Sequence, residues 1–271
     1  MRLARATRSE FTKQFSTSIW WILAIVLVLY IAMTAGGLAF VLAGVADGLI
    51  PSSAHIPALD DSATVIYGFS TSLGYVFALL LGTLIVTSEY RHQTLTPTFL
   101  AVPRRGTALL AKLVVAAVLG AFYGVLALAA AVGSGAGAFA VFSQPTGLDN
   151  PDMWWMFARI VLALVLWTLL GVGVGALVRN QVAAVVGVIA FTQLVEPIVR
   201  LAASFVDGAN DVAKFLPGAA SDALVGTGYL DFVASGSSGA MEWWLGAIVL
   251  GAYALVFLLL GYLSSWRRDI S

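Results

Sequence analysis

The sequence predicts an all-α polytopic membrane protein with six transmembrane helices, and three observations point to it. Hydrophobic residues make up 60% of the 271 residues and charged residues only 10%, against about 25% charged in a typical soluble domain. The uncharged residues gather in runs as long as a membrane-spanning helix. Most Lys and Arg residues lie on connections that would share one side of the membrane.

The composition also excludes several classes of protein. The formal net charge is zero, whereas a nucleic-acid partner requires a basic excess that neutralises phosphates. There is no Cys, and the two His residues, His55 and His92, lie far apart in the sequence. We therefore expect no metal site, no catalytic residue and no nucleic-acid partner. The low share of charged residues, 10%, excludes an ordinary soluble enzyme.

The membrane spans follow from the spacing of charges. A hydrocarbon core about 30 Å thick requires roughly 20 apolar residues of helix. Six stretches meet this requirement within a single domain, 1–271, with expected limits of about 20–43, 64–87, 108–132, 154–178, 182–206 and 243–264. The third run is longer than one span, and we expect its helix to end, bend or lie along the membrane surface at Gly133–Gly137, because glycine weakens a helix interior.

The distribution of basic residues predicts the orientation. Eleven of the 14 Lys and Arg residues lie before the first span, between spans two and three, between spans four and five, or after the last. The positive-inside rule places these segments, and therefore both termini, in the cytoplasm. The connections predicted on the other side of the membrane carry mostly acidic residues.

Two segments outside the spans are expected to form helices. In residues 1–19, Phe11, Phe15 and Ile19 recur at four-residue spacing, which favours a helix in the cytoplasmic interface over a plain basic flank. In the outer loop 207–242, Pro217–Val225 followed by Gly226 predicts a short helix with proline near its start and glycine just past its end.

The cytoplasmic loop 88–107 mixes charged side chains with apolar ones and contains two prolines. Pro97 can begin a short helix, and apolar side chains within a charged frame suit docking against another protein. The alternative is a solvated linker whose arginines only set the orientation.

The pattern of this loop resembles a known family. Glu89-x-Arg91-x-x-Thr94-Leu95, followed by Leu100, Pro103-x-Arg105 and Lys112, is similar to the first cytoplasmic loop of ABC type-2 transporter permeases, especially actinobacterial ones. Arg8-Ser9-Glu10-Phe11-x-Lys13, before Trp20-Trp21, resembles the helix that precedes that family's first span. Phe215-Leu216-Pro217-Gly218-Ala219-Ala220-x-x-Ala223-Leu224 resembles its outer-loop motif.

The resemblance implies a bacterial cell-membrane permease that pairs with a second permease copy or a related subunit, and with a separate nucleotide-binding ATPase subunit. Loop 88–107 would be a short coupling helix, and members of the family mostly export their substrates. Separately, the apolar walls of the spans, which carry few charges, suit a hydrophobic or amphiphilic substrate. The residues expected to couple to the ATPase are Glu89, Arg91, Thr94, Leu95, Phe99, Leu100, Arg104 and Arg105. Independently, no Lys follows a Gly, so the chain has no Walker A loop and a partner would bind ATP and Mg.

Ionisable residues within the spans are candidates for a translocation pathway or gate, since charge in lipid is costly. Glu196 and Arg200 lie four residues apart and can pair on one helix face. Arg159, at a similar depth in span four, can instead pair with Glu196. A polar gate and a structural ion pair are both compatible with this pattern. Pro197 is expected to kink span five or to begin a re-entrant turn.

Other functions stay open on the sequence alone. A secondary transporter or channel would use Glu196 as a proton or ion site, and a non-transporting scaffold would need no site. An intramembrane enzyme would need paired carboxylates, histidines or an activated nucleophile within the spans. Gly171-x-Gly173-x-Gly175 lies inside an apolar run, where small residues allow close contact between helices.

Overall fold

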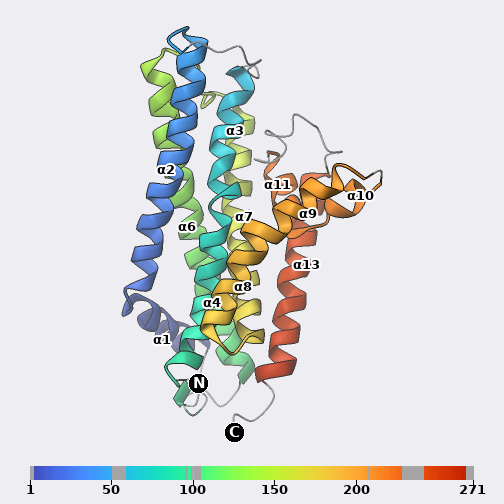
Figure 1. The fold of residues 1–271 in the computed structure, drawn as a ribbon. Coiled ribbons are helices and arrows are strands. Elements are labelled where there is room, and N and C mark those ends of the chain that lie inside the picture. Colours follow the sequence, from blue (N-terminus) through green and yellow to red (C-terminus); the bar gives the residue numbers. More distant parts are fainter. Residues whose placement is uncertain are drawn as a thin grey trace.

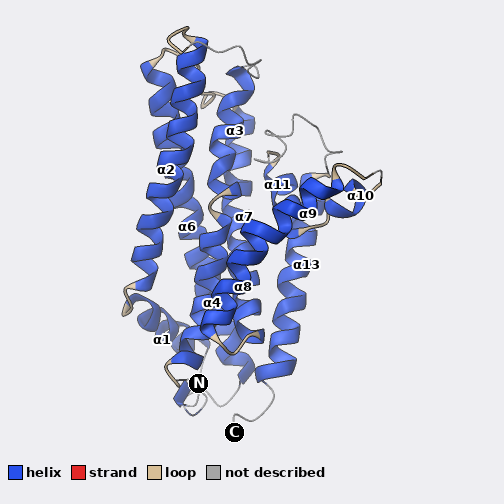
Figure 2. Cartoon of the chain, in the orientation of Figure 1, coloured by secondary structure: helices blue, strands red, loops and turns tan. Residues whose placement is uncertain are grey.

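The computed structural model describes residues 3–50, 59–94, 97, 98, 100, 105–206, 208–227 and 241–266. In this part of the chain the regular structure is entirely helical, as Figure 2 shows. The helices are α1 (Leu3–Phe15), α2 (Ile19–Ala46), α3 (Leu59–Ser72), α4 (Tyr75–Arg91), α6 (Arg105–Val141), α7 (Pro151–Leu177), α8 (Gln181–Ala190), η1 (Phe191–Val195), α9 (Glu196–Ala203), α10 (Asn210–Ala213), α11 (Pro217–Val225), α13 (Trp243–Gly261) and η2 (Tyr262–Trp266).

Among the described residues, six helical stretches are long and apolar enough to cross a membrane. They are Ile19–Ala46, Ser62–Arg91, Arg105–Val141, Pro151–Leu177, Gln181–Ala203 and Trp243–Ser264. The predicted all-α class and the six candidate spans are therefore confirmed. The predicted short helix between spans two and three falls mostly on residues outside the described part, and it stays a prediction.

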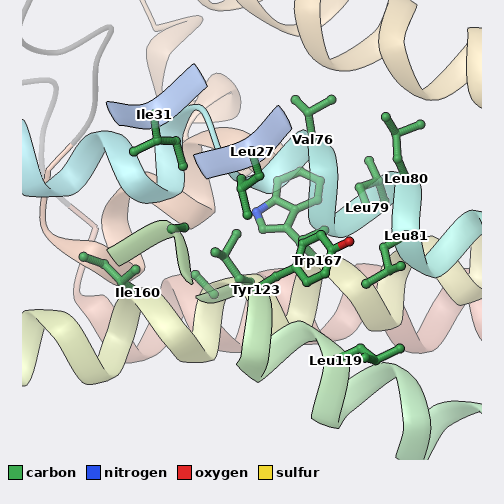
Figure 3. Close-up of a cluster of buried hydrophobic side chains, with 14 of the residues drawn as sticks. Leu27, Ile31, Val76, Leu79, Leu80, Leu81, Leu119, Tyr123, Ile160 and Trp167 are labelled. Carbon is green, nitrogen blue, oxygen red and sulfur yellow. The ribbon is translucent and has the colours of Figure 1, made fainter. Parts of the chain in front are cut away.

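The long helices run side by side, and α1 lies at the end of the bundle where α4 ends and α6 begins (Figure 1). Helix α7 is central: it packs against α4, α6 and α13, while α2 packs against α6. Figure 3 shows the core between them, where Leu27, Tyr123 and Trp167 meet side chains of α4. All three are almost completely buried.

Large apolar side chains remain exposed on the outer faces of α2, α8, α9 and α13. Met33 of α2, Leu194 of η1 and Leu255 of α13 are each more than half exposed. In water such extended apolar faces would be an aggregation liability. Hydrocarbon solvates them without cost, so these faces agree with a multi-pass membrane protein.

The second span is divided rather than continuous. Helix α3 ends at Ser72 and α4 begins at Tyr75, with a turn at Leu73 and Gly74 between them. A side chain on Gly74 would collide with the backbone carbonyl of Ser70. The glycine therefore permits the turn that places α3 and α4 on separate helical paths.

The expectation that the helix ends at Gly133–Gly137 is wrong. Helix α6 continues through these residues to Val141, over 37 residues, or about 55 Å at the usual rise of a helix. Packing explains why one of these glycines is tolerated: a Cβ on Gly135 would lie 2.7 Å from a methyl group of Ile66. The small residues let α3 approach α6 closely, and this contact offsets their weak helix propensity.

The predicted helix Pro217–Val225 is confirmed, but its surroundings differ from those of an exposed outer loop. Pro217 lies in its first turn, and Gly226 follows it with φ 94°, in the left-handed region that glycine favours. Most residues of α11 are buried, and the helix packs against α13, α7 and α3. The segment is therefore inserted among the spans, where it supplies polar groups.

The fifth span changes its winding in the middle. Between α8 and α9 lies one π-helical turn, η1, in which the N–H of Glu196 donates to the carbonyl of Phe191, five residues earlier. Pro197 follows directly and has no N–H to donate. The structure thus shows a π turn directly before Pro197, an irregularity that is frequent at functional sites. The kink or re-entrant turn expected at Pro197 stays a prediction.

Candidate functional site

Four charged side chains meet at the end of the bundle that holds α1. Lys112 Nζ lies 2.6 Å from Glu10 Oε2 and 3.0 Å from Glu89 Oε1. Lys13 Nζ lies 2.8 Å from an oxygen of each of the same two glutamates. Each lysine therefore contacts both carboxylates, and this four-charge cluster (Glu10, Lys13, Glu89 and Lys112) joins α1, α4 and α6.

The four-charge cluster is largely removed from water. The Lys112 side chain is 0% exposed and those of Glu10 and Glu89 are 5% and 6% exposed, whereas Lys13 is 39% exposed. Burial alone would raise the pKa of Glu10, but the charges and hydrogen bonds of Lys112 and Lys13 outweigh it and hold that pKa below its ordinary value. Burial would lower the pKa of Lys13, but its hydrogen bonds to the two glutamates raise it. Glu10 and Lys13 are therefore both stabilised in their charged forms.

The segment after α4 is bound back to the four-charge cluster. Lys13 Nζ donates to the hydroxyl of Thr98 at 3.1 Å. That hydroxyl donates to the carbonyl of Thr94 at 2.9 Å, and the Thr94 N–H donates to the carbonyl of Glu89. The start of the predicted coupling loop is thus linked through short contacts to α1.

The other predicted coupling residues are dispersed. Arg91 is exposed at the end of α4, Leu100 is 78% exposed, and Arg105 begins α6 half-buried. Leu95, Phe99 and Arg104 lie outside the described residues. Of the predicted set, Glu89 and Thr94 are the ones that the structure connects to the four-charge cluster, and the coupling role of the set stays a prediction.

A second polar site surrounds Glu196. Its Oε1 accepts hydrogen bonds from the backbone N–H groups of Gly218 and Ala219, in the first turn of α11. A Cβ on Gly218 would lie 2.5 Å from the same oxygen, so a larger residue there would displace the carboxyl. The N-terminus of a helix favours a negative group, and α11 provides that environment inside the bundle.

The described hydrogen bonds of Glu196 go to α11, whereas the sequence offered Arg159 and Arg200 as its possible partners. Arg200 instead forms an ion pair with Asp222, with Nη1 and Oδ2 2.8 Å apart, and Ser72 donates to the other oxygen of Asp222 at 3.2 Å. The inserted α11 explains the difference, because it provides both the backbone donors for Glu196 and the carboxylate for Arg200. This ion pair connects α9 to α11, and the hydrogen bond from Ser72 connects α3 to the same carboxylate.

Arg159 lies at the opposite end of α11. A Cβ on Gly226 would lie 3.8 Å from its Nη1, and in the described part of the chain its buried Nε has no hydrogen-bond partner. The nine residues of α11 span about 13 Å, which keeps Arg159 away from Glu196. The anion lies at the N-terminus of α11 and the cation near its C-terminus, so both charges complement the helix dipole.

The sequence alone does not reveal the partners of two residues of these sites. Lys112 belongs to the family pattern that follows loop 88–107, and Asp222 is one acidic residue of the segment 207–242. Both stand in otherwise apolar helical stretches, where an ionisable side chain requires a partner. That signal identifies the residues, but not the partners, which lie 102 and 22 positions away.

Comparisons with known proteins add no assignment to this geometry. The chain matches no protein-family model, and no curated protein matches it either. What the structure establishes is a helical protein with six candidate spans in its described part and two polar sites, one at the α1 end of the bundle and one around α11.

Proposed function

We propose that the chain is the permease subunit of an ATP-driven ABC exporter in a bacterial cell membrane. It would work with a separate nucleotide-binding ATPase subunit, which binds ATP and Mg, and with a second copy of the permease or a related subunit. The substrate would be hydrophobic or amphiphilic. The six candidate spans and the residue pattern of the N-terminal helix, loop 88–107 and α11 support this proposal.

The observation that carries the proposal is the four-charge cluster at both ends of the proposed coupling loop. Glu89 lies at the start of loop 88–107 and Lys112 lies five residues after its end, and both contact α1 through Glu10 and Lys13. A force applied to the loop by an ATPase would therefore act on α1, α4 and α6 together. Such a rigid unit is suited to switching a pathway between two states.

The proposal is tested by reconstitution with an ATPase. The full chain is co-expressed with any soluble Walker-motif ATPase that a neighbouring gene encodes, and the purified pair is placed in proteoliposomes with a panel of amphiphilic fluorescent substrates. We expect ATP-dependent accumulation of a substrate, abolished when the Walker lysine of the ATPase is replaced. Absence of any complex between the two chains would contradict the proposal.

Within that assay, Arg105→Ala is expected to uncouple hydrolysis from transport. Arg105 begins α6, directly after the proposed coupling loop. Loss of one partly exposed charge contact, worth about 1 kcal/mol, should lower the transport per ATP hydrolysed about three- to fivefold. Arg5→Ala, on the exposed face of α1, is the matched control. An unchanged transport-to-hydrolysis ratio in Arg105→Ala would contradict a coupling role for this residue.

One observation favours a second candidate, a proton- or ion-coupled secondary transporter. Among the described residues, Oε2 of Glu196 is buried and has no hydrogen-bond partner, as a site that exchanges a proton or ion would be. Under our first proposal Glu196 is structural, because its other oxygen fixes the start of α11.

Glu196→Gln separates the two candidates. The amide retains an acceptor for the N–H groups of Gly218 and Ala219, but it loses the negative charge that strengthens those bonds. We expect a melting temperature lower by about 4 °C, from a loss of roughly 1–2 kcal/mol, with ATP-driven transport intact. The secondary transporter would be favoured instead if the chain alone carried out proton-driven transport and if Glu196→Gln abolished that transport.

A further inference from the structure

A hollow of about 500 Å³ lies where three candidate spans end. Tyr90, Arg91, Arg179, Asn180, Gln181 and Val182 line it. Arg91 is the last residue of the second span, and the fourth and fifth spans end and begin within two residues of Arg179. In a membrane this depth is that of the lipid headgroups, not of the hydrocarbon core.

The charged side chains that line the hollow are both positive. Arg91 comes from the end of α4, and Arg179 from the short connection between α7 and α8. Arginine presents several N–H groups in a fixed plane that matches the oxygens of a phosphate. Two guanidinium groups line one hollow together with the amides of Asn180 and Gln181, and these donors match the oxygens of a singly charged phosphodiester.

An apolar stripe leads away from the hollow along α8. Val182 lines the hollow and is 68% exposed, and Val186 and Ile189 follow at helical spacing with exposures of 59% and 41%. Because α8 packs against α4 on another face, this stripe stays open to the surroundings. An acyl chain attached to a phosphate in the hollow would lie along it.

We propose that this hollow binds an anionic phospholipid, with the phosphate between Arg91 and Arg179 and an acyl chain on the stripe of Val182, Val186 and Ile189. The combination favours a lipid over a free phosphate, because a soluble anion would gain nothing from the apolar stripe. The site does not depend on the transport activity proposed above. A lipid bound there would hold the last residue of α4 and the first residue of α8 at the depth of the headgroups.

The test is native mass spectrometry of the full chain in detergent, titrated with dioleoyl phosphatidylglycerol or dioleoyl phosphatidylcholine. We expect the anionic lipid to bind at least about tenfold more tightly, and Arg91→Gln/Arg179→Gln to remove that preference, since each arginine near a membrane surface contributes about 1 kcal/mol. Arg5→Gln/Arg8→Gln makes the same change of charge on the exposed face of α1 and should keep the preference.

Two further variants control for misfolding and distinguish binding of a phospholipid from binding of free phosphate. Arg91→Lys/Arg179→Lys keeps both charges and should keep most of the binding, while Val182→Ser/Val186→Ser should weaken lipid binding about threefold or more. Equal binding of the two lipids, or an equal loss in the α1 control, would overturn the proposal. If millimolar inorganic phosphate displaced the bound lipid, the hollow would be a site for a free anion, and the proposal that it binds a phospholipid would be overturned.

Discussion

Lys112→Met is expected to destabilise the protein more than any other single change in the four-charge cluster. The Lys112 side chain is completely buried and contacts the carboxylates of both Glu10 and Glu89. Its removal leaves two buried negative charges with one half-exposed lysine between them. Breaking a buried ion pair in this way costs about 3–5 kcal/mol, which corresponds to a melting temperature lower by about 10 °C in a protein of this size.

The measurement is thermal unfolding of the detergent-purified chain, followed by the loss of the monodisperse peak in size-exclusion chromatography. Lys13→Met is the matched control, because Lys13 has the same two partners but is 39% exposed, and water can compensate for its loss. The double variant Lys112→Met/Glu10→Gln should recover roughly half of the loss, since it restores equal numbers of positive and negative charges. Equal effects of Lys112→Met and Lys13→Met would show that burial of Lys112 is unimportant.

The spans could be predicted from the sequence because their cause is local. A helix in lipid must satisfy its own backbone groups and carry few charges, so the spacing of Asp, Glu, Lys and Arg reveals it directly. The helix Pro217–Val225 was predictable for a similar reason, since Pro217 and Gly226 fix its ends through their own backbone preferences.

The continuity of α6 could not be predicted, because its cause is not local. Gly133–Gly137 would weaken an isolated helix, but neighbouring helices use the space that small residues leave. A Cβ on Gly36 of α2 would lie 2.8 Å from the Cβ of Ser134, which shows how closely α2 and α6 approach there. Which glycine faces a neighbour depends on a packing arrangement that helical periodicity alone does not specify.

The partners of the ionisable residues within the spans could not be predicted from the sequence either. The sequence places Glu196, Arg159 and Arg200 within spans, but the described partners of Glu196 and Arg200 come from α11. The sequence predicts that α11 is helical, but its mean composition does not distinguish an exposed outer helix from one inserted among spans. Once α11 is placed, the pattern has a simple physical basis: Glu196 at its N-terminus, Arg159 near its C-terminus, and Asp222 opposite Arg200.

Gly171→Ala is expected to have the second large effect, because α4 and α7 touch through their backbones at this glycine. A Cβ at Gly171 would collide with the carbonyl oxygen of Leu79 and lie 2.9 Å from the N atom of Thr83. On the other helix, a Cβ at Gly82 would lie 2.9 Å from the carbonyl carbon of Thr168. Backbone atoms cannot rotate away as a side chain can, so the two helices would have to separate.

The expected cost is about 3 kcal/mol, at the upper end for overpacking a core, and a melting temperature lower by about 10 °C. Gly187→Ala in α8 is the matched control, because nothing lies within 4 Å of its Cβ and alanine favours a helix by up to about 1 kcal/mol. If Gly171→Ala melted at or above the temperature of Gly187→Ala, close contact between α4 and α7 would be contradicted.

The consequences of this change should extend beyond stability, because α4 connects the two polar sites. Its last turn holds Glu89 in the four-charge cluster, and at its first residue the Tyr75 ring stacks on Trp167, with centroids 4.5 Å apart. The Tyr75 hydroxyl donates to the carbonyl of Thr192 in the π turn of the fifth span. A displacement of α4 from α7 would therefore disturb both ends of the bundle, whereas Gly187→Ala would disturb neither.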